Sequence, residues 1–220
     1  VRSQQFRLSH DGQLFDMEAD PGQREDVGHA HPEALLTLTA AQEKFRKEVL
    51  SELNPDQKRA FTVGHPDYAF TQLPARDAIA TGSIERSNRW PNCSYYTNWT
   101  STNDSIYWDV EVLKPGPYQA TLYYTCGEEN TGAAFRLSAN GTAVDFQINE
   151  AHNPPLEGAR YDRSPRNVSF VKDWKPLKAG NLQLKRGQQR LALSAKDIPG
   201  TQGIDFRLLQ LDRTEAHKSP

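Results

Sequence analysis

Residues 105–126, SIYWDVEVLKPGPYQATLYYTC, decide the fold class, because they contain two alternating runs on either side of a Pro-Gly-Pro turn. Apolar side chains recur at every second position, which is the period of a β-strand with one buried face. The predicted inward-facing residues are Ile106, Trp108, Val110 and Val112 in the first run, and Tyr118, Ala120, Leu122, Tyr124 and Cys126 in the second. We expect these two strands to be antiparallel neighbours.

Short runs of alternating apolar and polar residues continue to residue 214. Asn140-Gly141 lies between two such runs and is a strong signal for a two-residue hairpin turn. The runs at 167–174, 181–197 and 203–212 predict further strands, the middle one a hairpin that turns at residues 185–188. About eight short strands without a second helix are typical of an antiparallel β-sandwich of the jelly-roll or galactose-binding-like type. We assign residues 77–214 to this mainly β domain and expect 215–220 to be a disordered tail.

Residues 1–53 have a different pattern, a β-hairpin followed by one long amphipathic helix. The hairpin turns at residues 9–12, SHDG, and the helix begins at Pro32, which suits a first helical position. The residues of its stripe, which only Gln42 interrupts, are Leu35, Leu38, Gln42, Phe45, Val49 and Leu53. This spacing predicts about six turns of helix. A hairpin and a helix alone bury too little apolar surface for a stable domain, so we expect a larger partner.

Residues 54–76 separate these two parts and contain three prolines without a sustained period. They predict a linker that lies against a surface through Phe61, Tyr68 and Phe70.

The charge balance argues against two classes of partner. The chain has 26 basic and 28 acidic residues, a formal net charge of -2, and no polybasic run, so neither nucleic acid nor anionic lipid is expected. No run approaches the roughly 20 apolar residues of a membrane span. The two cysteines, Cys93 and Cys126, could form one disulfide or remain two thiols, and the sequence leaves both open.

A candidate binding site lies in residues 88–104, NRWPNCSYYTNWTSTND, where aromatic residues alternate with turn-forming polar ones. The candidate carbohydrate-binding residues are Trp90, Tyr95, Tyr96, Trp99 and Asp104. An aromatic face suits the C–H side of a sugar ring, and neighbouring polar groups suit its hydroxyls. The alternative is that these rings only pack, at a domain seam or at the end of the sandwich. The long loop 149–167, with three prolines, could likewise be a lid or a pad against a partner domain.

Catalytic chemistry has no clear candidate in this sequence. His29 and His31 lack a third ligand at a suitable spacing, so we predict no metal site. No Cys, Ser or pair of carboxylates lies in a pattern that indicates a nucleophile or an acid–base pair. The residues by themselves therefore predict no active site.

Two stretches resemble one enzyme family. Residues 11–23, DGQLFDMEADPGQ, and 31–49, HPEALLTLTAAQEKFRKEV, resemble the C-terminal end of a sulfatase, a family of the alkaline phosphatase superfamily. The residues that match its final strand and Asp-Pro turn are Leu14, Phe15, Asp16, Met17, Asp20 and Pro21. Residues 77–214 resemble the β-sandwich appended to some bacterial arylsulfatases, in the segments PNCSYYTNWTS, YWDVEV, YYTC and IPG.

The resemblance implies that this chain is the C-terminal fragment of an arylsulfatase-like sulfuric ester hydrolase. Sulfatases use a Cys or Ser that lies two residues before Pro or Ala and four before Arg, and neither Cys93 nor Ser3 fits. The formylglycine nucleophile and the calcium ligands would then lie in an upstream catalytic domain, and the isolated chain would be inactive. The resemblance also implies a periplasmic or secreted parent.

Three interpretations of the sandwich follow from the sequence. It could bind carbohydrate, such as a sulfated polysaccharide that the parent enzyme cleaves. It could be a purely structural appendage that packs on the catalytic domain. A stand-alone hydrolase is the third interpretation, and it lacks a candidate nucleophile or ligand cluster.

Overall fold

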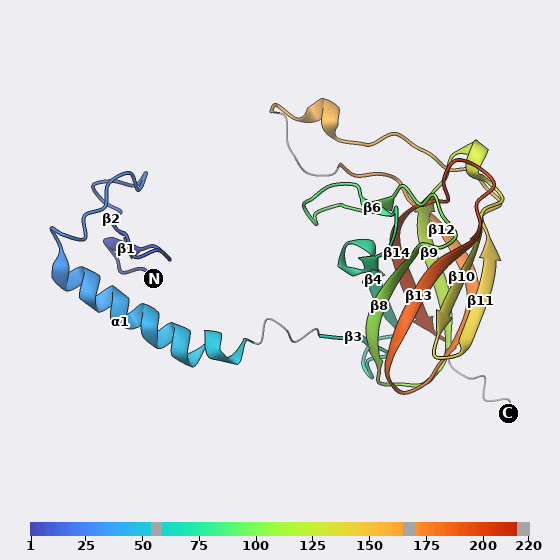
Figure 1. The fold of residues 1–220 in the computed structure, drawn as a ribbon, viewed down its shortest axis with the longest axis horizontal. Helices are drawn as coiled ribbons and strands as arrows, with labels where there is room; N and C mark the ends of the chain where they lie inside the picture. The colour runs from blue at the N-terminus through green and yellow to red at the C-terminus, as the bar shows by residue number, and fades with distance from the viewer. Residues whose placement is uncertain (54–58, 165–169, 215–220) are drawn as a thin grey trace. The chain divides into compact units, whose positions relative to one another are not determined.

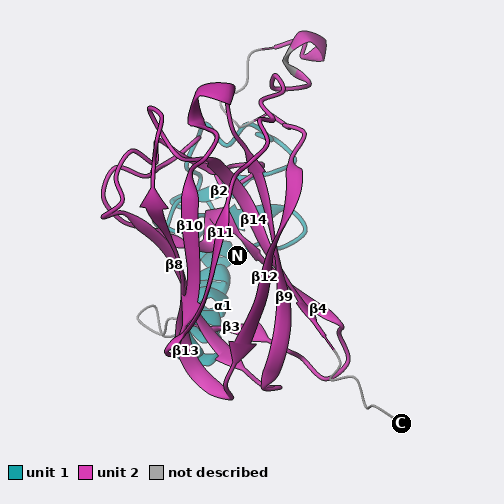
Figure 2. Ribbon diagram, turned by 90° about the vertical axis from the view of Figure 1, so that its right-hand side faces the viewer, with its two compact units in different colours: residues 1–58 teal, residues 59–220 magenta. Residues whose placement is uncertain are grey.

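The computed structural model describes residues 1–53, 59–164 and 170–214. The chain divides into two compact units, Val1–Lys58 and Arg59–Pro220 (Figures 1 and 2). Residues 54–58 of the predicted linker and the predicted tail at 215–220 lie outside the described residues.

The first unit is the predicted hairpin and helix. Strands β1 (Phe6–Leu8) and β2 (Leu14–Asp16) pair antiparallel, and α1 (Pro32–Glu48) is followed by a short 3₁₀ turn, η1 (Leu50–Glu52). The helix is shorter than predicted: it ends at Glu48 with Val49 as its C-cap, and Leu53, the last residue of the apolar stripe, has an extended backbone. Its core consists of Leu8, Leu14 and Leu38.

The apolar stripe of α1 is buried at only one end. Leu38 is 5% exposed, whereas Phe45 is 50% and Leu53 is 64% exposed. Gln42, which interrupts the stripe, has a structural use, because its amide donates a hydrogen bond of 3.0 Å to the Ser9 carbonyl in the hairpin turn. The unit thus buries a small core and leaves half of its helix stripe uncovered.

The second unit is a sandwich of two β-sheets. The first sheet has the order β11 (Thr142–Gln147), β10 (Ala134–Ala139), β13 (Gly187–Asp197), β8 (Ser105–Val112) and β3 (Phe61–Val63), and β5 (Ile79–Ala80) also pairs with β8. The second sheet has the order β12 (Lys175–Leu184), β9 (Gly116–Thr125), β14 (Asp205–Arg213), β7 (Tyr96–Thr97) and β6 (Glu85–Arg86), and β4 (Phe70–Pro74) also pairs with β14. Every pairing is antiparallel except that of β3 with β8.

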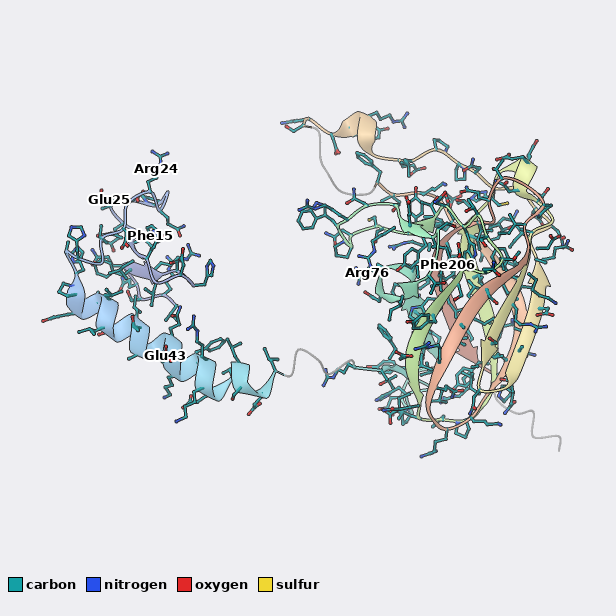
Figure 3. The ribbon with its side chains drawn as sticks, in the orientation of Figure 1. Phe15, Arg24, Glu25, Glu43, Arg76 and Phe206 are labelled. Carbon is teal, nitrogen blue, oxygen red and sulfur yellow. The ribbon has the colours of Figure 1, made fainter. Side chains whose placement is uncertain are left out.

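The inner faces of the two sheets form one hydrophobic core. All nine residues predicted to face inward in residues 105–126 are buried, the most exposed being Cys126 at 4%. The largest fully buried side chains of this unit are Trp99, Trp108, Tyr118, Tyr124, Phe135 and Phe206, the last of which Figure 3 marks among the packed side chains. The mainly β, jelly-roll-like sandwich predicted from the alternating runs is confirmed.

Two of the predicted strand pairings are wrong. Strands β8 and β9, expected to be neighbours, lie in opposite sheets, and so do β12 and β13, which the sequence predicted to be a hairpin. Alternation identifies which face of a strand is buried, but two strands that face each other across the core have the same pattern as two strands in one sheet. The Asn140-Gly141 hairpin of β10 and β11 is correct, with φ angles of 45° and 82° that suit this turn.

The predicted linker is also partly wrong. Within residues 59–76, β3 pairs with β8 and β4 pairs with β14, so this segment adds an edge strand to each sheet. The prolines obscured these strands. Pro74 is the last residue of β4, which is an edge strand, and edge strands are where a sheet accepts proline. The strand expected at 167–174 is absent from its described part, where the Glu157–Val171 bridge is isolated.

Candidate functional site

Tyr96 and Trp99, two of the predicted sugar-binding residues, belong to the core. Trp99 is 1% exposed and packs edge-on against Phe135, with ring centroids 5.1 Å apart. Tyr96 is 6% exposed, and its hydroxyl donates a hydrogen bond of 2.7 Å to the Ala78 carbonyl. These rings are not accessible to a ligand, because the sandwich closes over them.

Asp104 is also structural. Its carboxylate is buried and accepts hydrogen bonds from the Ser83 backbone N–H at 2.8 Å and from the Ser83 hydroxyl at 2.6 Å. A Cβ at Gly82 would lie 1.7 Å from Asp104 Oδ1, and the φ of Gly82 is 66°, so this approach requires glycine. Asp104 therefore holds the turn at residues 81–83, and its side chain is already occupied by these bonds.

Trp90 and Tyr95 remain accessible, and they lie in different settings. Trp90 is 43% exposed, and the Arg89 guanidinium carbon lies 4.2 Å from the centroid of its ring. Tyr95 is half-buried and directly precedes β7, next to Thr97 on the outer side of the second sheet. Of the five predicted residues, these two could contact a ligand.

A second aromatic ring, which the sequence did not single out, accompanies Tyr95. Trp174 is half-buried, and its ring centroid lies 5.0 Å from that of Tyr95 at an interplanar angle of 63°. The two rings thus pack edge to face at one end of the second sheet. In the sequence, Trp174 lay inside a segment predicted as a strand. The feature that could have drawn attention to it is its position directly before the alternating run of β12.

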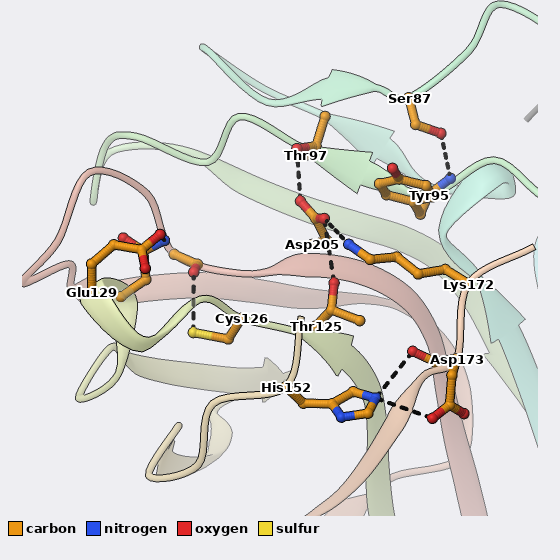
Figure 4. A network of polar contacts seen from close by, with 12 residues as sticks. Ser87, Tyr95, Thr97, Thr125, Cys126, Glu129, His152, Lys172, Asp173 and Asp205 are labelled. Atoms are coloured by element: carbon orange, nitrogen blue, oxygen red, sulfur yellow. Dashed lines mark hydrogen bonds and ion pairs between the residues drawn. The ribbon is translucent and has the colours of Figure 1, made fainter. Parts of the chain in front are cut away.

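A buried ion pair holds this aromatic pair in place. Lys172 Nζ lies 2.8 Å from Asp205 Oδ2, and the two side chains are 7% and 13% exposed (Figure 4). The same ammonium lies 5.6 Å from the Tyr95 ring centroid and 5.7 Å from that of Trp174. Because Lys172 is buried whereas both rings are half-exposed, the cation lies on the protein side of the aromatic pair.

Asp205 is the centre of the surrounding polar contacts. The hydroxyls of Thr97 and Thr125 donate hydrogen bonds to its two oxygens, at 2.7 Å and 3.3 Å. Burial raises the pKa of the Tyr95 phenol, and the negative charge of Asp205 raises it further, so Tyr95 is neutral at physiological pH. We define the aromatic corner as Tyr95, Trp174, Lys172, Asp205 and Thr97.

The long loop after β11 is tied down beside the aromatic corner. His152 forms an isolated bridge with Cys126, and its Nε2 lies 3.3 Å from the Asp173 carboxylate, next to Trp174. Glu150 forms an ion pair with Lys175. Farther along, a hollow of about 450 Å³ is lined by Pro155, Leu156, Glu157, Gly158 and Arg160.

The possible disulfide is not formed, since Cys93 and Cys126 are both free. Cys126 is buried at the end of β9 and donates to the Gly127 carbonyl at 3.3 Å. Burial is the main cause that raises the pKa of its thiol to about 11, so Cys126 is a protonated core residue.

Neither metal binding nor membrane insertion is indicated by the part of the chain that the structure covers. Its His, Cys, Asp and Glu side chains form no group of three that could hold a metal ion. Its one α-helix lacks the length and the apolar character that crossing a bilayer requires.

The second unit therefore belongs to the class of two-sheet, jelly-roll-like β-sandwiches. No protein-family model and no curated protein matches the sequence. Among solved structures, the chain is similar to the mosquito-larvicidal Cry4Aa toxin of Bacillus thuringiensis, at 15% identity and a TM-score of 0.50, over 76% of this chain and 26% of the toxin. At this identity the likeness shows the fold alone.

Two further similarities are to carbohydrate-active proteins. A GH26-CBM35 β-(1,4)-mannanase of Podospora anserina matches at 13% identity and a TM-score of 0.47, over 68% of this chain and 28% of the mannanase. A family 35 carbohydrate binding module of Clostridium thermocellum matches at 18% identity and a TM-score of 0.44, over 66% of this chain and 98% of the module. The chain thus spans about a quarter of the length of the toxin and of the mannanase.

Proposed function

We propose that the second unit is a carbohydrate-binding module whose site is the aromatic corner. The observation that carries this proposal is the accessible pair of Tyr95 and Trp174, 5.0 Å apart and inclined at 63°, fixed from behind by Lys172 and Asp205. The likeness to solved structures concerns the fold, so the proposal rests on the side chains of the site.

The chemistry of the corner suits a sugar ring. One aromatic face can stack on the apolar C–H side of a pyranose, while the second ring covers its edge. Among the described residues, the Tyr95 hydroxyl has no hydrogen-bond partner, so it can exchange a hydrogen bond with a sugar hydroxyl. The rings are held before binding, which lowers the entropy lost when a ligand is fixed.

Affinity measurements on two variants and a matched control test this proposal. Tyr95→Ala and Trp174→Ala should each weaken binding at least tenfold to whichever member of a glycan panel binds, with sulfated carrageenan and fucoidan beside unsulfated agarose, laminarin and mannan. Tyr107→Ala, which removes a half-buried tyrosine on the outer side of the other sheet, should leave the affinity unchanged. Saturable binding should also shift the tryptophan emission of the unaltered protein.

A purely structural role is the second candidate function. Its support is that Tyr96, Trp99 and Asp104 are all buried, that Tyr96 and Asp104 form hydrogen bonds inside the unit, and that Trp99 packs on Phe135. If no glycan in the panel binds, the sandwich is a structural appendage and the aromatic corner is a packing feature.

For the first unit, we infer a sulfatase-like parent, in which residues 1–53 form the end of the catalytic domain. The parentage rests on the resemblance of residues 11–23 and 31–49. The small core of three buried leucines and the exposed Phe45, Val49 and Leu53 support a larger partner for this unit and do not identify that partner. The parent would hydrolyse a sulfate ester, and a sulfated polysaccharide would be its natural glycan. Formylglycine and calcium would belong to a part of the parent outside this chain.

The gene sequence upstream of the Val1 codon tests the parentage directly. A Cys or Ser two residues before Pro or Ala and four before Arg is the expected finding. An upstream reading frame without that run would refute the sulfatase parentage and leave the carbohydrate-binding proposal intact.

A further inference from the structure

We propose that the ligand of the aromatic corner is a polysaccharide chain of several linked sugars, which continues from the corner along the outer face of the second sheet. This inference rests on the proposed function and names the class of ligand. It depends on a second group of side chains, which the strand register brings together across β12, β9, β14 and β4.

An apolar row crosses the sheet next to the corner. The pairing places Pro176 opposite Tyr123, Tyr123 opposite Leu208, and Leu208 opposite Pro74, so these four side chains share one face. That face is the outer one, since the adjacent residues Leu122, Leu209 and Leu73 are completely buried in the core. Tyr123 and Leu208 are half-buried and Pro176 is exposed.

A polar row lies two residues farther along the same strands. The Gln72 amide donates to Gln210 Oε1 at 3.2 Å, and the Gln210 amide donates to both oxygens of Asp212 at 3.0 Å and 3.1 Å. These bonds order the amides, while the exposed Gln72 keeps its own carbonyl oxygen and one N–H free for a ligand among the described residues. Opposite Asp212 lies Phe70, which is 52% exposed.

The alternation of these rows fits a saccharide chain better than a protein partner. Along β14 the apolar row is one side chain wide, so a ligand that follows this strand meets the Tyr95 hydroxyl of the corner on one side of the row and the glutamines on the other. A protein interface requires a broader apolar centre, whereas a chain of pyranose rings presents narrow apolar faces bordered by hydroxyls. The two rows therefore offer a ligand the same kinds of contact as the aromatic corner, an apolar surface beside hydrogen-bonding groups.

The length of the face sets the size of the ligand. β14 has a bulge between Phe206 and Leu208, so its length is read from β9, where the partners of Asp205 and Asp212 are Thr125 and Gln119. These are six residues apart, which at a rise of roughly 3.3 Å per residue is about 20 Å. This length exceeds that of a single sugar ring, so one sugar can occupy only the corner. Contacts along the whole face therefore require several linked sugars.

Chain-length dependence of binding tests this inference on the unaltered protein. The probes are carrageenan and laminarin oligosaccharides of two, four, six and eight units, measured by isothermal titration calorimetry. We expect the affinity to rise at least tenfold between two and six units in the series that binds. An equal affinity for all lengths would overturn the inference and leave the aromatic corner as a site for a short ligand.

Two variants separate the face from the corner. Tyr123→Ala and Gln210→Ala should lower the affinity for six units about fivefold to tenfold and leave that for two units unchanged. Trp174→Ala should instead lower the affinity for both lengths. Thermal unfolding of each variant shows whether it is folded, and Tyr123→Phe, which keeps the ring, should bind six units as the unaltered protein does. Unchanged binding of six units by Tyr123→Ala would overturn the inference. Failure of every oligosaccharide and of every polysaccharide in the panel to bind would overturn the proposed function as well.

Discussion

Lys172 and Asp205 form an ion pair of 2.8 Å inside the second unit, although they come from separate segments of the chain and are 33 residues apart. Lys172 precedes β12 and Asp205 begins β14, so the pair joins the segment that carries Trp174 to the middle of the second sheet. Its ammonium also lies 5.6 Å and 5.7 Å from the ring centroids of Tyr95 and Trp174. One buried electrostatic contact thus lies directly behind the two proposed sugar-binding rings.

Removing one partner of this pair should destabilise the second unit strongly. Asp205→Ala leaves a buried ammonium without its counter-charge and two threonine hydroxyls without their acceptor, so we expect a loss of about 3–5 kcal/mol. Lys172→Met combined with Asp205→Asn removes both charges and keeps an acceptor oxygen, and should recover most of that loss. Urea denaturation of the unaltered protein, of Asp205→Ala and of the double variant measures these differences in the free energy of unfolding. If Asp205→Ala were as stable as the double variant, the prediction would be contradicted.

Trp99 and Trp90 should respond oppositely to truncation. Trp99→Ala creates a cavity in a closed core beside Phe135, so we expect a loss of about 3–5 kcal/mol in the free energy of unfolding. Trp90→Ala removes an exposed ring and should change stability by no more than about 0.5 kcal/mol. Chemical denaturation of both variants checks the contrast, and comparable losses would show that Trp99 is not a core residue.

The two thiols should differ in reactivity in the native protein. Cys126 is buried with a pKa raised to about 11, so at pH 8 it is protonated and shielded from alkylation. Cys93 is half-buried in the loop before β7 and should react. Mass spectrometry after iodoacetamide should show one label on the native chain and two after denaturation without reductant. No label in denaturant would show that the disulfide forms.

The first unit should weaken in acid. Backbone N–H groups donate to Asp26 from Gly28 at 2.9 Å and from Leu14 at 3.0 Å, and these bonds lower its pKa from 3.8. The pKa of Asp16 and that of Asp20 are lowered in the same way, mainly by the N–H groups of Ala19 and Glu25. A folded-state pKa below the unfolded value stabilises the fold above about pH 3.8, and this stabilisation is lost as the pH falls through the lowered values.

Amide NMR measures this pH dependence at the backbone N–H groups that donate to Asp26. The Leu14 and Gly28 resonances should titrate with a midpoint below 3.8, and Asp26→Asn should abolish that titration. The Leu122 amide, in the core of the second unit, should not follow it. A midpoint at or above 3.8 would refute the role of Asp26.

The sequence was most informative where a local rule fixes the outcome. Alternation identified the buried face of β8 and β9, the Asn140-Gly141 pair identified its hairpin, and Pro32 marked the start of α1. These features depend on neighbouring residues, so the sequence contains the information that decides them.

The candidate site could be predicted only in part, because part of it depends on contacts between residues far apart in the chain. Tyr95 lies in an aromatic stretch that attracts attention, whereas Trp174 becomes its neighbour only through the pairing of distant strands. Tyr96 and Trp99 looked equivalent to Tyr95 in sequence, yet the closing of the sandwich buries them. Aromatic composition does not distinguish a ring that binds from a ring that packs.

The sequence by itself determined the β-sandwich class, the inward faces of its central strands, and the hairpin and helix of residues 1–53. Only the tertiary structure decided that β8 and β9 lie in opposite sheets, that residues 61–63 and 70–74 are edge strands, and that Lys172, Asp205, Tyr95 and Trp174 meet at one corner. The physical reason is that burial of a face follows from the period of a single strand, whereas the choice of its partner depends on contacts between residues far apart in the chain.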